Sequence, residues 1–173
     1  MSSEERCCAV AEADAAADPV QGSVGSSVSG RCACGAVRYR APAVLRAPVA
    51  CHCAECRRTS GHYVVAIATG RDGLEIEGAQ AMRWWASSPD CRRGFCGICG
   101  ASLFWERLGS GRISIHAGTL DRPTGLALAG HIFTDEKGDY YEINDALPSA
   151  GGASDRLLHT GVTQRPGQLP GAS

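Results

Sequence analysis

The sequence predicts a mainly β domain held together by metal ions, with no more than short helical turns. Short stretches of alternating apolar and polar residues are bounded by Gly, Pro and Ser, as in strands that are joined by turns. No stretch has the long 3.6-residue apolar period of an amphipathic helix. Ten cysteines occur in 173 residues, and seven of them form clusters with C-x-C or C-x-x-C spacing. That spacing is typical of metal sites.

The predicted elements follow one another as short segments. A turn at Cys34-Gly35 leads into a strand that includes Val37 and Tyr39, because apolar residues alternate there with Arg38 and Arg40. Residues 55–60 are the one place where a short helix is expected. Further strands are expected over residues 62–68, 74–77, 82–86, 101–106, 112–117, 130–133 and 140–143.

The composition divides the chain into three parts. Residues 1–29 are rich in Ala, Ser, Asp and Gly, and residues 149–173 are rich in Gly, Ser, Pro and Gln. Such segments bury little apolar surface, so both are expected to be flexible tails. We expect residues 30–148, between these tails, to form one domain that binds zinc. Its length is usual for a single domain.

Cysteine spacing predicts two zinc sites. Cys32, Cys34, Cys96 and Cys99 form two knuckles, each followed by a Gly that permits a sharp turn, and together they make a closed four-sulfur site. The remaining cluster, Cys51, Cys53 and Cys56, has only three sulfurs and so leaves a coordination position open, as in catalytic zinc sites. Spacing alone leaves one alternative, in which the middle cluster shares its metal with Cys96 and Cys99.

Charged and nucleophilic residues near the clusters allow more than one interpretation. Arg57 and Arg58 follow the open site directly, and they are candidates for binding substrate carboxylates or for offsetting the charge of the thiolates. Arg92 and Arg93 are weaker candidates for the same roles. Cys91 would close the open site if it were a ligand, but its isolated position favours an unligated thiol.

The other cysteines and the histidines carry less weight. Cys7 and Cys8 are interpreted as an unligated adjacent pair in the N-terminal tail. Alternation points His52 away from the metal. His62, His116 and His131 lie in strand-like sequence, where a lone histidine is more often a packing residue than a metal ligand. Each could also supply a general base or a hydrogen bond to a metal ligand. No Ser-His-Asp order, phosphate-binding glycine loop or nucleotide fingerprint is visible.

Charge and hydropathy narrow the functional classes. The formal net charge is -1, which gives no general attraction to nucleic acid or to an anionic membrane. No segment reaches the roughly 20 apolar residues that span a bilayer. No secretory signal is visible, so a reducing cytoplasmic location is expected, and metal binding is favoured over disulfides.

Several motifs together resemble the glutathione-dependent formaldehyde-activating enzyme family, also called the centromere-protein-V-like family. The match covers about residues 30–148. The motifs are G-x-C-x-C-G-x-V-x-Y from Gly30, C-H-C-x-x-C-R-R from Cys51, S-S-P-x-x-x-R-G-F-C-x-x-C-G from Ser87, G-T-L-D from Gly118, H-I-F from His131 and E-I-x-D-x-L-P from Glu142.

The resemblance implies an Mss4-like (β-tent) fold with two zinc ions per chain. It implies that Cys32, Cys34, Cys96 and Cys99 hold a structural zinc, and that Cys51, Cys53 and Cys56 hold a zinc open to a thiol. It further implies that glutathione is a co-substrate and adds to formaldehyde to give S-hydroxymethylglutathione, which is a carbon–sulfur lyase reaction run in reverse.

The chain departs from the family pattern near its end. Tyr140-Tyr141 stand where many members carry a Trp-aromatic pair, and Gly138-Asp139 replace a small residue and a proline. These departures concern the substrate rather than the fold. Two functions are therefore weighed: a zinc enzyme that acts on thiol–aldehyde adducts, and a zinc-stapled binding module for a protein partner.

Overall fold

The strands form two sheets that enclose the main core. The computed structural model describes residues 27–158. The small sheet has the order β1-β2-β5 and the large sheet has the order β10-β3-β4-β9-β8-β7-β6. The bounds of the strands are β1 Val28–Arg31, β2 Arg38–Ala41, β3 Arg46–Cys51, β4 Val64–Gly70, β5 Glu75–Glu77, β6 Met82–Ala86, β7 Cys91–Cys96, β8 Ser102–Arg107, β9 Arg112–His116 and β10 Gly130–Ile132.

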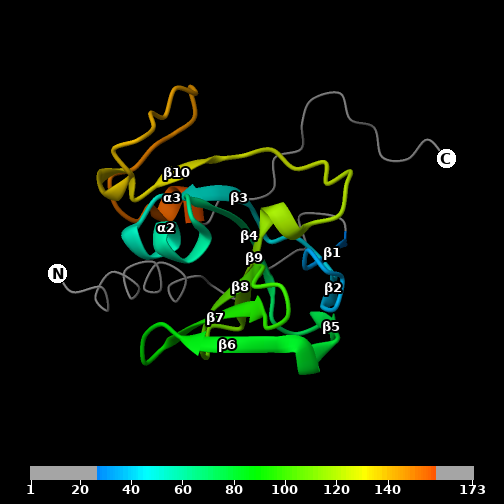
Figure 1. Ribbon diagram of the computed structural model, residues 1–173. Helices are drawn as coiled ribbons and strands as arrows, with labels where there is room; N and C mark the ends of the chain where they lie inside the picture. The colour runs from blue at the N-terminus through cyan, green and yellow to red at the C-terminus, as the bar shows by residue number, and fades with distance from the viewer. Residues whose placement is uncertain (1–26, 159–173) are drawn as a thin grey trace.

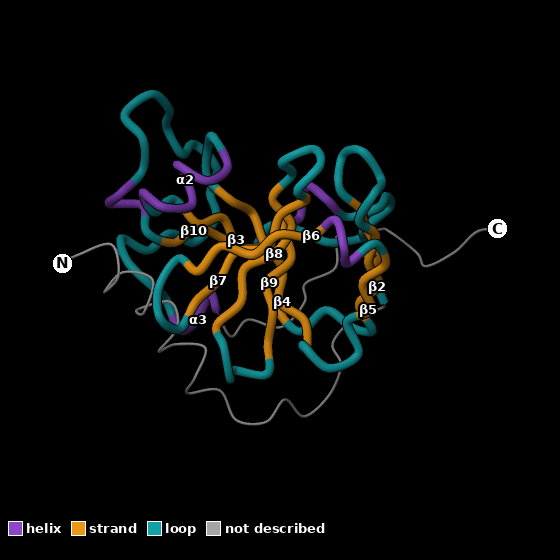
Figure 2. Tube along the Cα trace, turned by 60° about the horizontal axis from the view of Figure 1, so that its bottom comes forward, coloured by secondary structure: helices purple, strands orange, loops and turns teal. Residues whose placement is uncertain are grey.

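Helices in the described part are short. They are α2 Ala54–Ser60, α3 Asp155–Leu158 and the 3-10 turns η1 Ala79–Ala81, η2 Ala117–Thr119 and η3 Thr134–Glu136. Within residues 27–158, no helix has the length and apolar character that crossing a membrane requires. Figures 1 and 2 show the small sheet at one side of the molecule, and α2, α3 and β10 together at the other. The mainly β class predicted from the sequence is confirmed.

Alternation along the strands gives the large sheet two different faces. In β9, Ile113 and Ile115 are buried in the main core, together with Phe104 of β8. Tyr39 of β2 contacts the ring of Phe104 edge to face, with the ring centroids 5.3 Å apart. Ser114, the residue between the two isoleucines, instead lines a cavity on the opposite face.

The expected elements are largely present, with two corrections. Residues 140–143 form no strand, because the two tyrosines there pack against His62 and one another instead of joining a sheet. Residues 149–158 belong to the folded part and are not a loose tail. His131 N donates to the Pro148 carbonyl, Ala150 N donates to the His131 carbonyl, and Leu157 and Leu158 are buried against β3 and β10.

The N-terminal boundary also shifts slightly. β1 begins at Val28, and it pairs with β2 in antiparallel register. Gly30 in β1 faces the Tyr39 hydroxyl and the Thr119 carbonyl at a distance that leaves no room for a Cβ atom. This close approach explains why a glycine opens the first cysteine motif. Cys7 and Cys8 lie outside the described residues.

Candidate functional site

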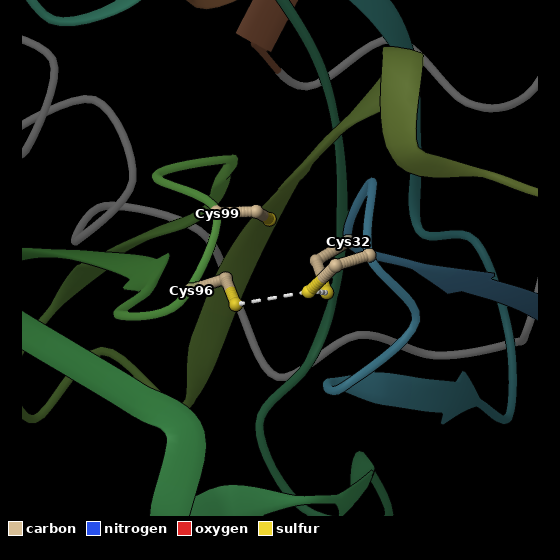
Figure 3. A group of neighbouring side chains, drawn as sticks. Cys32, Cys96 and Cys99 are labelled. Atoms are coloured by element: carbon tan, nitrogen blue, oxygen red, sulfur yellow. Dashed lines mark hydrogen bonds between the residues drawn. The ribbon is translucent and has the colours of Figure 1, made fainter.

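The structure brings the four predicted sulfurs of the closed site together. The Sγ atoms of Cys32, Cys34, Cys96 and Cys99 lie within 4.8 Å of one another. Cys32 and Cys34 come from the loop after β1, and Cys96 and Cys99 come from the end of β7 and the turn that follows it. In Figure 3 the side chain of Cys96 points toward the knuckle that carries Cys32, and the dashed line from Cys96 marks its contact with Cys34. The two knuckles join segments that are 62 residues apart in sequence.

The spacing of these sulfurs fits a tetrahedral metal ion. The Cys32 and Cys34 sulfurs are 3.5 Å apart, and those of Cys34 and Cys96 are 3.8 Å apart. A zinc ion with Zn–S bonds of about 2.3 Å requires sulfurs about 3.8 Å apart. Gly35 and Gly100 have φ of +77° and +75°, so each knuckle turns in the left-handed conformation that glycine permits. Four thiols in this geometry could hold a metal ion that cross-links the two sheets.

The three-cysteine cluster lies where β3 ends and α2 begins. The sulfurs of Cys51, Cys53 and Cys56 lie within 4.8 Å of one another, and this group includes none of the other described cysteines. The alternative in which they share a site with Cys96 and Cys99 is therefore wrong. Cys53 caps the N-terminus of α2, since its sulfur accepts a 3.3 Å hydrogen bond from Cys56 N. The cap and the first helical turn fix two of the three sulfurs relative to each other.

The three thiols affect one another's ionisation. Hydrogen bonds from Cys51 and Cys56 lower the pKa of the Cys53 thiol well below its usual range. Once Cys53 is ionised, a second thiolate beside it is unfavourable. The hydrogen bond between Cys51 and Cys53 therefore raises the pKa of the Cys51 thiol. A divalent cation would remove this repulsion, because metal ligation deprotonates coordinating thiols. The cluster therefore has the donor set of a metal site with three protein ligands.

A buried arginine reaches this cluster from β7. The Arg93 guanidinium nitrogens lie 3.8 and 3.9 Å from Cys56 Sγ. Arg93 Nε also donates to Glu55 Oε1 at 2.8 Å, and the side chains of Arg93 and Glu55 are only 10% and 17% exposed. Arg93 thus places one positive charge beside the thiols, and Glu55 holds it there.

The neighbouring Arg92 has a different role. It lies over the Trp84 ring and binds Glu106, which also accepts a hydrogen bond from Arg71. The two consecutive arginines of β7 therefore serve opposite faces of the sheet, as strand alternation requires.

A cavity of about 320 Å³ adjoins the three-cysteine cluster. Its floor is the outer face of the large sheet, and residues of α2 line it from the other side. The lining includes all three cysteines, Arg58, Arg93 and His116, with Val49, Val64, Ala66, Trp85, Trp105 and Leu158 among the apolar members. The open side of the cluster thus adjoins a space whose volume is typical of small-molecule sites.

His116 on the cavity floor has a polar atom that is left unsatisfied. It is 9% exposed, and its Nε2 atom is buried without a hydrogen-bond partner among residues 27–158. Burial, with a smaller contribution from the positive charge of Arg93, lowers the pKa of His116 to about 4. The imidazole is therefore neutral near pH 7. Its Nε2 atom can donate one hydrogen bond to a bound molecule or accept one from it, depending on the tautomer.

On the other side of the cysteine segment, His52 begins a chain of hydrogen bonds that runs from the interior to the exposed Asp145. His52 Nδ1 lies 2.6 Å from the Tyr141 hydroxyl, and His52 Nε2 lies 2.9 Å from His131 Nδ1. His131 Nε2 in turn lies 3.0 Å from an Asp145 carboxylate oxygen. Because a carboxylate only accepts, His131 donates from Nε2, His52 donates to His131, and Tyr141 donates to His52. With one N–H on each ring, this arrangement gives every ring nitrogen a hydrogen-bond partner, and it anchors the residue between Cys51 and Cys53.

The remaining predicted residues are less central. Arg58 lines the cavity, whereas Arg57 is not among its lining residues. Cys91 lies outside both clusters and is buried against Trp105. His62 bonds to the exposed Tyr140 at 3.1 Å. Sequence reasoning gave Arg93 little weight, although its alternation with Arg92 along β7 carries the signal that separates them.

Comparisons with known proteins relate the chain to one family by sequence. Residues 27–136 match a family described as "Glutathione-dependent formaldehyde-activating enzyme". A Halomonas elongata protein provisionally named for the same activity is 29% identical over 129 residues, which cover 67% of this chain and 80% of the relative. A crystal structure of a Rhodobacter sphaeroides protein aligns with a TM-score of 0.49 and 21% identity, covering 60% of this chain and 98% of that one.

Proposed function

The chain belongs to the glutathione-dependent formaldehyde-activating enzyme family, and from this membership we propose that it is a zinc-dependent enzyme of the carbon–sulfur lyase type. Its substrates would be a thiol and an aldehyde, with glutathione and formaldehyde as the pair that the family description names. The observation that carries the proposal is the cavity of about 320 Å³ beside three cysteines that have no fourth sulfur next to them among residues 27–158.

The proposed reaction forms one carbon–sulfur bond. The thiolate sulfur attacks the aldehyde carbon, the electron pair of the carbonyl π bond moves to oxygen, and that oxygen takes up one proton. The proton replaces the one that the thiol lost, so the addition is balanced without an oxidant or a reductant. Cleavage of the same bond in the reverse direction is the lyase reaction.

A zinc ion held by Cys51, Cys53 and Cys56 would lower the pKa of an incoming thiol and keep it in the nucleophilic thiolate form. We assign the second zinc to Cys32, Cys34, Cys96 and Cys99, where a closed four-sulfur shell is suited to a structural role.

The chain's own residues would support the reaction at the cavity. Arg93 offsets negative charge at Cys56, and its contact with Glu55 keeps the guanidinium in place. Arg58 lies on the cavity lining and is exposed, so it is suited to hold a glutathione carboxylate at the rim. Arg57 follows Cys56 on α2 outside the lining, and we propose a supporting electrostatic role for it there. A thiol-based reaction of this kind suits a reducing compartment such as the cytoplasm.

The test combines metal analysis with a rate measurement. We expect two zinc ions per chain, entry of the glutathione sulfur into one zinc shell by X-ray absorption, and saturable acceleration of hemithioacetal exchange measured by NMR. Cys53→Ser should retain one zinc and lose the acceleration. If fully zinc-loaded protein accelerates no pairing across several thiols and aldehydes, the enzyme proposal is wrong and a protein-binding module is the better interpretation.

A further inference from the structure

The cavity is larger than formaldehyde requires. One water molecule takes up about 30 Å³ of liquid, so an aldehyde with only two heavy atoms needs roughly twice that. The cavity of about 320 Å³ is about five times this volume. Either glutathione or a substituent on the aldehyde must account for the remaining space.

The lining of the cavity suits an apolar group better than the charged ends of glutathione. Val64 and Ala66 of β4 supply floor positions, and Trp85 and Trp105 supply indole surfaces on β6 and β8. A carboxylate or ammonium group placed against such surfaces loses its hydration without compensation. Flat apolar groups bind well against indole rings, because large aromatic contact areas are favourable.

The arginines of the cavity also favour an apolar group in the interior and the charged ends of glutathione elsewhere. Arg93 already contacts Glu55 and Cys56, and Arg46 Nη1 donates to the backbone carbonyls of Ala47 and Ala66. Arg58 is exposed, so it can meet a carboxylate while the rest of glutathione stays in water. The charged ends of the thiol are thus best accommodated at the rim, and the apolar interior is left for the other reactant.

The floor contains a polar atom, His116 Nε2, that a bound adduct would satisfy. Addition of a thiol to an aldehyde creates a hydroxyl group on the carbon that carries the sulfur. His116 lines the cavity, and its Nε2 has no hydrogen-bond partner within residues 27–158. A buried imidazole nitrogen without a partner is costly, and a hydroxyl group can either donate to it or accept from it.

From these observations we propose that the cavity is a subsite for aldehydes with a flat apolar substituent, bound with the substituent against Trp85 and Trp105 and the adduct hydroxyl on His116. This inference rests on the proposed function and names its substrate class: aromatic or extended apolar aldehydes rather than formaldehyde alone. The sulfur, the hydroxyl group and the substituent each have a separate part of the lining.

Stable thioethers test the subsite without catalysis. Zinc-loaded protein is titrated with S-benzylglutathione and S-methylglutathione by calorimetry. The benzyl compound is expected to bind at least about tenfold more tightly, because the ring buries several additional carbon atoms. Trp85→Ala and Trp105→Ala should each reduce this preference severalfold, and Leu108→Ala, a half-exposed residue outside the lining, should preserve it. Thermal unfolding checks that each variant is folded, and the half-exposed Trp85 is the safer of the two substitutions.

Equal affinity for the two thioethers would overturn the subsite while leaving the proposed enzyme intact. If neither thioether binds and glutathione itself does not enter the zinc shell, both proposals fail. Rates provide a second measurement: kcat/KM for benzaldehyde relative to formaldehyde, after division by the uncatalysed rates, should exceed one and fall in Trp85→Ala. A ratio below one that the variant leaves unchanged would contradict the inference.

The hydroxyl contact is tested by His116→Phe, which keeps a flat ring and removes the nitrogen. Its kcat/KM should fall at least about tenfold for both aldehydes, because both adducts carry the hydroxyl group. Its affinity for S-benzylglutathione, which has no hydroxyl group, should change far less. Equal losses in rate and in thioether affinity would show that His116 acts only in packing, and would overturn this part of the proposal.

Discussion

Replacing Arg93 with Gln tests whether the buried cation supports the three-cysteine site. Gln keeps the approximate shape of the side chain near the sheet and removes the positive charge. In the wild-type protein that charge lies 3.8 Å from Cys56 Sγ and 2.8 Å from Glu55. The variant therefore leaves the Glu55 carboxylate, which is 17% exposed, without this guanidinium.

Two losses should be measurable. Breaking a buried ion pair by removing one partner typically costs about 3–5 kcal/mol, and the partial exposure of Glu55 places the expected loss near 3 kcal/mol. For a chain of this length, that corresponds to a fall in Tm of roughly 6–12 °C. Zinc affinity at the three-cysteine site should fall about 10- to 100-fold, the usual effect of losing a residue that contacts a metal ligand.

The assay pairs thermal unfolding with zinc competition against a chelator. Arg92→Gln is the matched control, because Arg92 is the neighbouring residue on β7 but is 32% exposed and faces Glu106. It should cost less than about 1 kcal/mol and leave zinc affinity unchanged, since Glu106 keeps its contact with Arg71. The double variant Glu55→Gln/Arg93→Gln should recover part of the lost stability.

If Arg93→Gln is no more destabilising than Arg92→Gln and binds zinc equally well, the ion pair has no role at the site. If stability falls but zinc affinity does not, Arg93 supports only the fold. The ion pair supports the site only if Arg93→Gln loses both stability and zinc affinity while Arg92→Gln keeps both.

Three further predictions concern the two cysteine sites, the histidine chain and pH. Cys96→Ser should unfold the domain, whereas Cys53→Ser should leave it folded with one zinc ion. Metal analysis and thermal unfolding measure both effects, and the opposite pattern would reverse the roles of the two sites. Asp145→Asn removes the acceptor for His131, and because Asp145 is 44% exposed we expect a loss of only about 1 kcal/mol in urea unfolding, with a severalfold loss of zinc affinity at the three-cysteine site. The folded-state pKa of His116, about 4, lies below the usual value of 6.5. Between these two pH values the unfolded chain binds one more proton at this residue than the folded chain does, so stability should fall as the pH drops from about 6.5 to 4. His116→Gln should lose a few kcal/mol of that dependence, and an unchanged pH profile in urea unfolding would contradict the assignment.

Much of the local structure could be predicted because it depends on local rules. The strand over residues 82–86 matches β6, since alternation and β propensity act on neighbouring residues. The short helix expected at residues 55–60 is α2. The expected strand at residues 140–143 failed for a tertiary reason: Tyr141 bonds to His52, which lies 89 residues earlier in the chain.

The C-terminal boundary shows the same limit. Residues 149–158 have the composition of a linker, yet Leu157 and Leu158 are buried against β3 and β10. Composition measures how much apolar surface a segment has on average, and two leucines are enough to dock a four-residue helix where apolar partners such as Val49 and Ile132 are available.

By itself, the sequence determined the cysteine knuckles, their turn glycines and the grouping of three sulfurs at Cys51, Cys53 and Cys56. These features are set within a few residues, where spacing and backbone conformation fix the geometry. Only the tertiary structure decided that Cys96 and Cys99 meet Cys32 and Cys34, and that they do not meet the cluster at residues 51–56. It also decided that Arg93, rather than Arg92, faces Cys56, and that an apolar cavity containing His116 adjoins the open cluster. Each of these depends on which strands pair and on which face of the sheet meets the cysteines. Alternation along β7 separates Arg92 from Arg93, but it does not say which of the two faces the cluster.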